Sequence, residues 1–217
     1  VAAKQATTWD GKPVTGIDIN SNGAKFTVNI NNCTTTGFPT GLNSNSDLWN
    51  VKDAGKAHVN VYVDGAQVWF AGYEYVADGL LYNGKEYVVI SAKGLVALSA
   101  KTIKGGETVK LGADIDLTGV EFNGLNAFNP EPNNTFDGQG YTVSNWTYTG
   151  KADDMGFIRN WVGPIKNLTI KNAILRTGGR SAVIAAKPYG NIENCHVVDC
   201  NLQANYWACG LIAGMHN

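Results

Sequence analysis

Two carboxylates, Asp114 and Asp116, have a spacing that could support catalysis. On a strand, side chains two residues apart point to the same side and lie about 6.6 Å apart along it. This is close to the ~6.5–9.5 Å that separates the two carboxyl groups of inverting glycosidases. The alternative, which we favour, is that both carboxylates accept hydrogen bonds from turn amides or lie on an exposed face. We therefore predict no catalytic residue and no hydrolytic centre.

The remaining reactive side chains lack a partner at motif spacing. His58 and His216 have no carboxylate or cysteine partner at the spacing of a metal site or a catalytic triad, and His196 is expected to point outward because its neighbours Cys195 and Val197 point inward. Asp153 and Asp154 are adjacent, but no calcium-loop spacing surrounds them. The chain contains no Gly-x-Ser-x-Gly, His-Glu-x-x-His or Cys-x-x-Cys motif. We predict no metal and no cofactor.

A hairpin over residues 58–70 offers a surface that could bind a ligand instead. Two alternating runs flank Asp64-Gly65, a pair typical of a type I′ turn. The expected register places Val61 opposite Val68 on one face. It places Tyr62 opposite Gln67, and Asn60 opposite Trp69, on the other.

The second face of this hairpin is the predicted ligand-binding surface. Flat aromatic rings with a polar tip can stack on sugar rings, and we therefore predict Tyr62, Trp69 and Trp49 as ligand-binding residues. The alternative is that this face packs against a second sheet or against the cap of the C-terminal part of the chain.

Composition restricts the classes of function. Only 16% of the 217 residues are charged, whereas 26 are glycine and 24 are asparagine, which favours many turns and left-handed backbone positions. The 17 basic and 18 acidic residues give a net charge of −1, so we predict no nucleic-acid partner. No apolar run reaches the ~18 residues of a membrane span, and no export signal is present in this chain.

The C-terminal half repeats itself. The segment 163–175 aligns with 190–202 at an offset of 27 residues, which matches Ile165 with Ile192 and Asn167 with Asn194. An earlier copy fits at an offset of 22, which matches Asn145 with Asn167 and Val143 with Ile165. Strand-like repeats of this length indicate a solenoid. We expect Asn145, Asn167 and Asn194 to stack as one amide ladder in a parallel β-helix.

These patterns divide the chain into two parts. Residues 1–86 are predicted to form a β-rich N-terminal module. Residues 87–217 are predicted to form a capping α-helix, over 91–103 with Ser91 as its N-cap, followed by the parallel β-helix. The fold class is therefore all-β.

The second part resembles a known family. Tyr87-Val-Val-Ile-Ser-Ala-Lys-Gly-Leu-Val-Ala-Leu98, the Asp-Ile-Asp strand over 111–117 and Phe136-Asp-Gly-Gln-Gly-Tyr-Thr-Val143 are similar to segments of secreted and surface proteins of gut Bacteroidetes and some Firmicutes that carry the GLUG repeat. The resemblance covers about 87–217. It implies a right-handed β-helix with an N-terminal capping helix, and it implies a structural role for Asp-Ile-Asp, which recurs in members that share no chemistry.

The expected function is non-catalytic. The resemblance implies an exported, extracellular or cell-surface protein, and we expect it to act in binding or adhesion on glycans or proteins. The alternatives are a β-helix enzyme that acts on polysaccharide, and a structural subunit of a fibre or viral appendage. Because residues 209–217 carry none of the devices that protect a sheet edge, we expect the solenoid either to continue beyond 217 or to self-associate at this end.

Overall fold

The computed structural model describes residues 17–19, 23–32, 49–51, 56–126, 133–206 and 209–214. The chain forms two units, Val1–Asn83 and Gly84–Asn217, and their boundary lies three residues before the predicted one between 86 and 87. Strands hold 45% of the chain and helix holds 5%, so the all-β class is confirmed. Among the described residues, no helix has the length and apolar character needed to cross a membrane.

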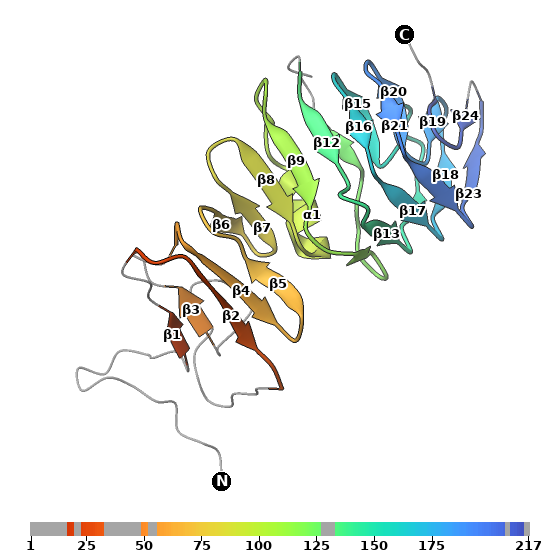
Figure 1. Ribbon diagram of the computed structural model, residues 1–217. Coiled ribbons are helices and arrows are strands. Elements are labelled where there is room, and N and C mark those ends of the chain that lie inside the picture. Colours follow the sequence, from red (N-terminus) through yellow and green to blue (C-terminus); the bar gives the residue numbers. More distant parts are fainter. Residues whose placement is uncertain are drawn as a thin grey trace. The chain divides into compact units, whose positions relative to one another are not determined.

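The first unit is built around a three-stranded sheet (Figure 1). Its central strand pairs in parallel with one neighbour and antiparallel with the other. A parallel pair and a hairpin complete the described strands of this unit. Their bounds are β1 (Ile17–Ile19), β2 (Phe26–Ile30), β3 (Trp49–Val51), β4 (Val59–Val63), β5 (Ala66–Trp69), β6 (Glu74–Ala77) and β7 (Leu80–Tyr82). The core of the unit contains Ile19, Ile30, Val59, Val61 and Trp69.

The hairpin of β4 and β5 confirms the predicted turn. Asp64 has φ 47° and Gly65 has φ 84°, and positive φ at both central residues defines a type I′ turn. The register next to the turn is also as predicted, with Tyr62 opposite Gln67.

Further from the turn, the predicted register is wrong. A bulge lies between Val61 and Tyr62, so Val61 pairs with Trp69 and not with Val68. Because side chains alternate between the two faces of a strand, one extra residue moves Trp69 from the outer face to the core. The carbonyl of the extra residue, Val68, accepts a hydrogen bond from the hydroxyl of Tyr75.

The second unit begins with one strand and one helix. The helix α1 (Ala92–Ser99) starts after Ser91, whose Oγ accepts a hydrogen bond from the amide of Gly94 at 3.2 Å. The predicted N-cap is therefore confirmed. The helix ends four residues before the predicted end at 103, because Lys101 N–H donates to the carbonyl of Leu98 in a tighter turn. Leu95 and Leu98 are buried.

The rest of this unit is a β-solenoid of about three turns (Figure 1). Corresponding strands of successive coils pair in parallel, and in the described residues they form the following sheets. The first sheet contains β8 (Glu86–Val89), β9 (Thr108–Leu111), β12 (Thr135–Asp137), β16 (Ile165–Lys166) and β21 (Ile192–Glu193). The second contains β10 (Ile115–Asp116), β13 (Thr142–Ser144), β17 (Thr169–Lys171) and β22 (His196–Val198).

Two further sheets and one short pair complete the coils. The third sheet contains β14 (Thr147–Thr149), β18 (Ile174–Thr177) and β23 (Asn201–Ala204). The fourth contains β11 (Leu125–Asn126), β15 (Ile158–Trp161) and β20 (Ala185–Pro188), and β19 (Ser181–Ala182) pairs with β24 (Cys209–Gly210).

The strand pairing confirms one predicted offset and corrects the other. Ile165 pairs with Ile192, as the offset of 27 requires. Val143, however, pairs with Ile170 and not with Ile165, so the earlier copy also follows an offset of 27 and the offset of 22 is wrong. The strands that contain Ile165 and Ile170 follow one another in the same coil and have similar sequences. The offset of 22 aligned Val143 with the first of these strands, whereas its partner is the second.

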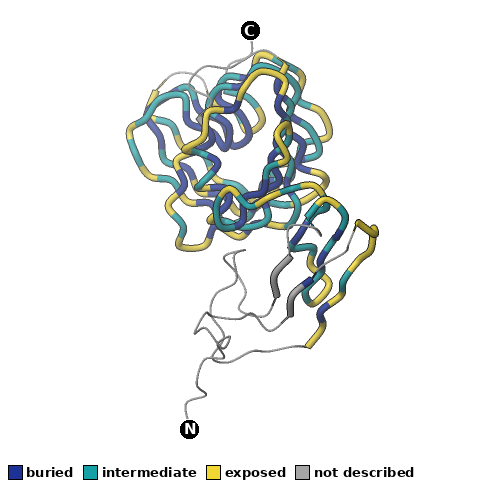
Figure 2. Tube along the Cα trace, turned by 90° about the vertical axis from the view of Figure 1, so that its left-hand side faces the viewer, coloured by how far each residue is buried: buried dark blue, intermediate teal, exposed yellow. Residues whose placement is uncertain are grey.

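The interior of the solenoid is apolar and rich in aromatic rings. Figure 2 shows the buried residues on the inner side of the coils. Phe122, Phe157 and Trp146 pack against one another with ring centroids 5.6–6.3 Å apart, and Nε1 of Trp146 donates to the carbonyl of Phe122 at 2.9 Å. The indole is therefore buried with its one polar atom satisfied.

Glycines at one corner of the solenoid allow successive coils to approach closely. Gly163 has φ 126°, and a Cβ there would lie 1.9 Å from the carbonyl oxygen of Asn134. One coil further on, a Cβ at Gly190 would lie 2.2 Å from the carbonyl oxygen of Gly163. The glycine that opens each repeat is therefore required by contact between backbones.

The stacked interior predicts a large difference between two isoleucines. Ile170 is fully buried and Ile174 is 46% exposed. We expect Ile170→Ala to lower the free energy of unfolding by about 2–5 kcal/mol, because it leaves a cavity. The matched control Ile174→Ala should change it by less than about 0.5 kcal/mol. Urea denaturation measures both, and equal effects would contradict the assignment of the interior.

Candidate functional site

The two carboxylates with catalytic spacing are structural. Asp114 Oδ1 accepts a hydrogen bond from the amide of Thr142 at 2.8 Å. Asp116 Oδ1 accepts from Asn145 Nδ2 at 2.9 Å and from the amide and hydroxyl of Thr118 at 2.9 and 2.7 Å. These hydrogen bonds, led by that of Asn145, hold the pKa of Asp116 below its usual value. A general acid requires the opposite shift.

Asp116 and Asp137 each begin a ladder of side chains that runs from coil to coil. In the first ladder, Asn145 donates to Asp116, and Asn172 Nδ2 lies 3.4 Å from Asn145 Oδ1. In the second ladder, Asn167 Nδ2 donates to Asp137 Oδ1 at 3.0 Å, and Asn194 Nδ2 donates to Asn167 Oδ1 at 2.9 Å. The prediction of a single ladder through Asn145, Asn167 and Asn194 is therefore wrong, because Asn145 occupies a different corner of the coil.

The carboxylate of Asp137 is buried but well stabilised. Burial acts to raise its pKa, yet the hydrogen bonds from Asn167 and from the amide of Gln139, together with the ammonium of Lys166, outweigh burial and lower it. Lys166 Nζ lies 3.4 Å from Asp137 Oδ2. The charged form of Asp137 is thus the form that the fold favours.

A second group of charges ties neighbouring coils together. Asp154 lies 2.9 Å from Arg180 Nε and 2.7 Å from Lys187 Nζ, and Asp154 itself has φ 55°. The side chain of Arg159 donates to the carbonyls of Asp153 and Asp154. Because the carboxylate is matched by cations from the next coil, this cluster serves to hold the corner of the solenoid in place.

Among the described residues, a pocket in the first unit offers a place to hold a ligand. It has a volume of about 480 Å³, which lies in the ~300–1,000 Å³ range of small-molecule sites. It lies where β2 and β4 begin and where β5 has just ended. Its lining residues are Lys25, Phe26, Thr27, Ala57, His58, Asn60 and Ala71.

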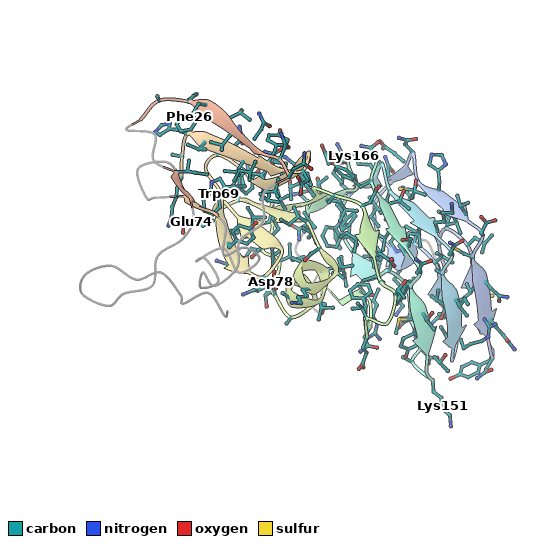
Figure 3. The ribbon with its side chains drawn as sticks, turned by 90° about the horizontal axis from the view of Figure 1, so that it is seen from below. Phe26, Trp69, Glu74, Asp78, Lys151 and Lys166 are labelled. Atoms are coloured by element: carbon teal, nitrogen blue, oxygen red, sulfur yellow. The ribbon has the colours of Figure 1, made fainter. Side chains whose placement is uncertain are left out.

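Parallel pairing of β2 and β4 brings the polar lining residues together. Thr27 is paired with Asn60. Lys25 and His58 precede these two residues by two positions, and side chains two apart in an extended segment share a face. All four residues therefore belong to the outer face of the sheet. Phe26, which is 37% exposed, lies at the margin of the unit in Figure 3.

A chain of hydrogen bonds orients the amide of Asn60. Its Oδ1 accepts from the amide of Ala71 at 3.0 Å and from Gln67 Nε2 at 3.1 Å. Gln67 Oε1 in turn accepts from the hydroxyl of Tyr62 at 3.0 Å. Since the oxygen of Asn60 is occupied by two donors, its NH₂ group is the part that it can offer to a ligand.

His58 adds a second polar group that can form a hydrogen bond to a ligand. Its Nδ1 is buried and makes no hydrogen bond to any residue that the structure describes. A buried ring nitrogen normally has a partner. A ligand atom in the pocket could supply it.

The predicted ligand-binding residues are separated. Tyr62 lies on the outer face and contributes to the pocket through Gln67. Trp69 is only 1% exposed and lies in the core, within the strands in Figure 3, so its ring is not available for stacking; this corrects the prediction, and the cause is the bulge. The backbone of Trp49 belongs to β3, and its side chain lies outside the described residues.

The structure also locates the other side chains considered for chemistry. His196 is exposed, with Nε2 3.3 Å from Asn194 Oδ1. His216 lies outside the described residues. Within the described part of the chain, no group of three or more His, Cys, Asp and Glu side chains is arranged to hold a metal ion.

Fold and site together define a β-solenoid protein with an additional β-sheet module that contains a polar pocket. Comparison of the chain with protein-family models, with curated proteins and with solved structures finds no match. Membership of the GLUG repeat family therefore stays a prediction.

The buried carboxylate at the base of the second ladder predicts how stability depends on pH. The pKa of Asp137 is lower in the folded chain than the ~3.9 of an unfolded one. Its contribution is therefore present above about pH 4 and is lost as the pH falls through the folded-state pKa. We expect the free energy of unfolding, from urea denaturation, to fall below about pH 4, and Asp137→Asn to weaken this dependence.

The matched control is Glu121→Gln, which removes one exposed carboxylate from the same unit. It should leave the slope of stability against pH close to that of the unaltered protein. If Asp137→Asn left this slope unchanged as well, the stabilisation of the Asp137 carboxylate by its ladder would be disproved.

Proposed function

We propose that this protein is a non-catalytic, exported binding protein that holds a glycan in the pocket of its first unit. The observation that carries this proposal is the pocket of about 480 Å³, whose polar side chains lie on one face of a sheet. The resemblance to surface proteins with GLUG repeats supports an extracellular or cell-surface location. It also supports a right-handed solenoid in which α1 acts as the cap.

The chemistry of the lining favours a polar ligand with many oxygen atoms. Thr27, His58 and Asn60 provide hydrogen-bonding groups, and Phe26 adds an exposed aromatic residue. The hydroxyl groups of a sugar can bond to these polar side chains, and its apolar C–H face can contact the ring of Phe26. A wholly apolar ligand would leave the NH₂ of Asn60 without a partner, which is unfavourable once water is excluded.

Tyr62 acts in this proposal as a positioning residue. Its hydroxyl fixes Gln67, and Gln67 fixes Asn60. The predicted ligand-binding role of Tyr62 is thus indirect. Trp49, whose side chain lies outside the described residues, stays a predicted ligand-binding residue.

Variants of the pocket test glycan binding. A glycan array on the intact chain identifies a ligand, and titration calorimetry then compares variants. We expect Asn60→Ala to weaken binding about tenfold or more, since it removes two hydrogen-bond donors. Tyr62→Phe should weaken it by a smaller factor and leave the binding stoichiometry unchanged.

The control for this experiment is Asn29→Ala. Asn29 is exposed and pairs with Tyr62 on the same sheet, but it does not line the pocket. It should bind as the unaltered protein does. Equal loss in Asn29→Ala and Asn60→Ala, or unchanged binding in both, would reject this pocket as the binding site.

A second proposal concerns self-association through the last described coil. Leu211 and Ile212 are 54% and 38% exposed there. Val197 is only partly covered, whereas Ile170, its counterpart one coil earlier, is fully buried. A coil with an uncovered apolar interior is suited to stack against a second copy of the chain.

Sedimentation velocity over a range of concentrations tests the second proposal. We expect the intact chain to associate as concentration rises, and Leu211→Lys to remain monomeric because a charge would be buried at the contact. Ile174→Lys, on an exposed strand of the same unit, should associate normally. A chain that is monomeric at all concentrations would refute self-association.

A further inference from the structure

The described lining of the pocket in the first unit contains donors of hydrogen bonds and a positive charge, but no acidic residue. Lys25 supplies an ammonium with three donors, Thr27 a hydroxyl and Asn60 an oriented NH₂. None of the described residues that line the pocket is acidic. The described lining therefore carries the positive charge of Lys25 and no negative charge.

Among the described residues, the nearby acid Glu74 is paired with a different lysine. Lys56, which directly precedes the lining residue Ala57, lies 3.5 Å from Glu74 Oε1. Glu74 is therefore matched by its own cation. Gln67, which lies behind Asn60, is neutral and directs its Nε2 to the Asn60 oxygen, so that the NH₂ of Asn60 stays available.

We propose that the glycan held here carries a carboxylate, as a hexuronic acid residue does. This inference rests on the proposed glycan-binding function and specifies its ligand class. A carboxylate has two acceptor oxygens and no donor, which makes it complementary to the ammonium of Lys25 and the NH₂ of Asn60. The ring of His58 has a buried nitrogen without a described partner and can bond to the acid or to an adjacent hydroxyl.

The charged contact is expected to contribute more to selectivity than to total affinity. Lys25 is exposed, so its Coulomb attraction is screened by water and salt. The NH₂ group of Asn60, in contrast, can also donate hydrogen bonds to an uncharged oxygen of the ligand. Loss of the ligand's charge should therefore weaken binding without abolishing it.

The decisive experiment compares one sugar with and without its charge. Titration calorimetry is performed with oligosaccharides of hexuronic acids and with their methyl esters, which keep the same ring and hydroxyl groups. We expect the acids to bind about tenfold more tightly than the esters at low salt, because hydrogen bonds to a charged group are the stronger ones. The difference should shrink as salt is added.

Variants separate the charge from the rest of the site. Lys25→Met keeps the apolar stem and removes the ammonium, so we expect it to reduce the difference between acid and ester to about threefold or less. Lys171→Met, an exposed lysine of the solenoid, is the matched control and should preserve the difference. Asn60→Ala should weaken the binding of both ligands.

The outcomes distinguish the two proposals. If acid and ester bind equally well and Asn60→Ala weakens both, glycan binding stands and the acidic ligand class is refuted. If neither ligand binds while a neutral glycan binds in an Asn60-dependent way, the ligand class is again refuted alone. If no glycan binds, both proposals fail.

Discussion

Parallel stacking of coils is the constraint on which most of this structure depends. Because strands of successive coils pair in register at about 4.8 Å, each side chain lies directly on its counterpart one coil away. The side chain at each position must therefore pack against, or form a hydrogen bond or ion pair with, the side chains at the equivalent positions of the coils before and after it. Inward-facing positions meet this condition with apolar columns, such as Val143, Ile170 and Val197. One outer column meets it by alternating charge, since Lys110, Asp137, Lys166 and Glu193 are successive partners.

The amide ladders satisfy the same constraint at the corners, and they have a direction. Asn145 and Asn167 each donate through Nδ2 to the preceding coil and accept through Oδ1 from the next one. The first member of a ladder needs only to accept, and an aspartate is a pure acceptor. This accounts for Asp116 and Asp137 where the asparagines begin. It also explains why the Asp-Ile-Asp segment, which has the spacing of a catalytic pair, is part of the architecture.

The repeat was sufficient to predict the class of fold, but not every register. One coil has asparagine at two corners, Asn167 and Asn172, five residues apart, and both follow a short strand. Asn145 could be aligned with either, and the sequence alone favoured the wrong one. The position of Trp69 was unpredictable for a different reason, because the alternation of β4 and β5 contains no sign of the bulge that reverses its face. The pocket was missed because Lys25 and His58 are far apart in sequence and are joined only by the parallel pairing of β2 with β4.

The same constraint separates the parts of the chain that can vary from those that cannot. A substitution on a solenoid strand must suit the coil before it and the coil after it, so a new charge or donor there disturbs two neighbours. The open end of the β2–β4–β5 sheet is free of this double requirement. Lys25 and His58 precede their strands, and Ala71 follows β5, so their side chains need not match a stacked copy. A cluster of unmatched donors costs little there, which is the physical reason for proposing that the small sheet, and not the solenoid, binds the ligand.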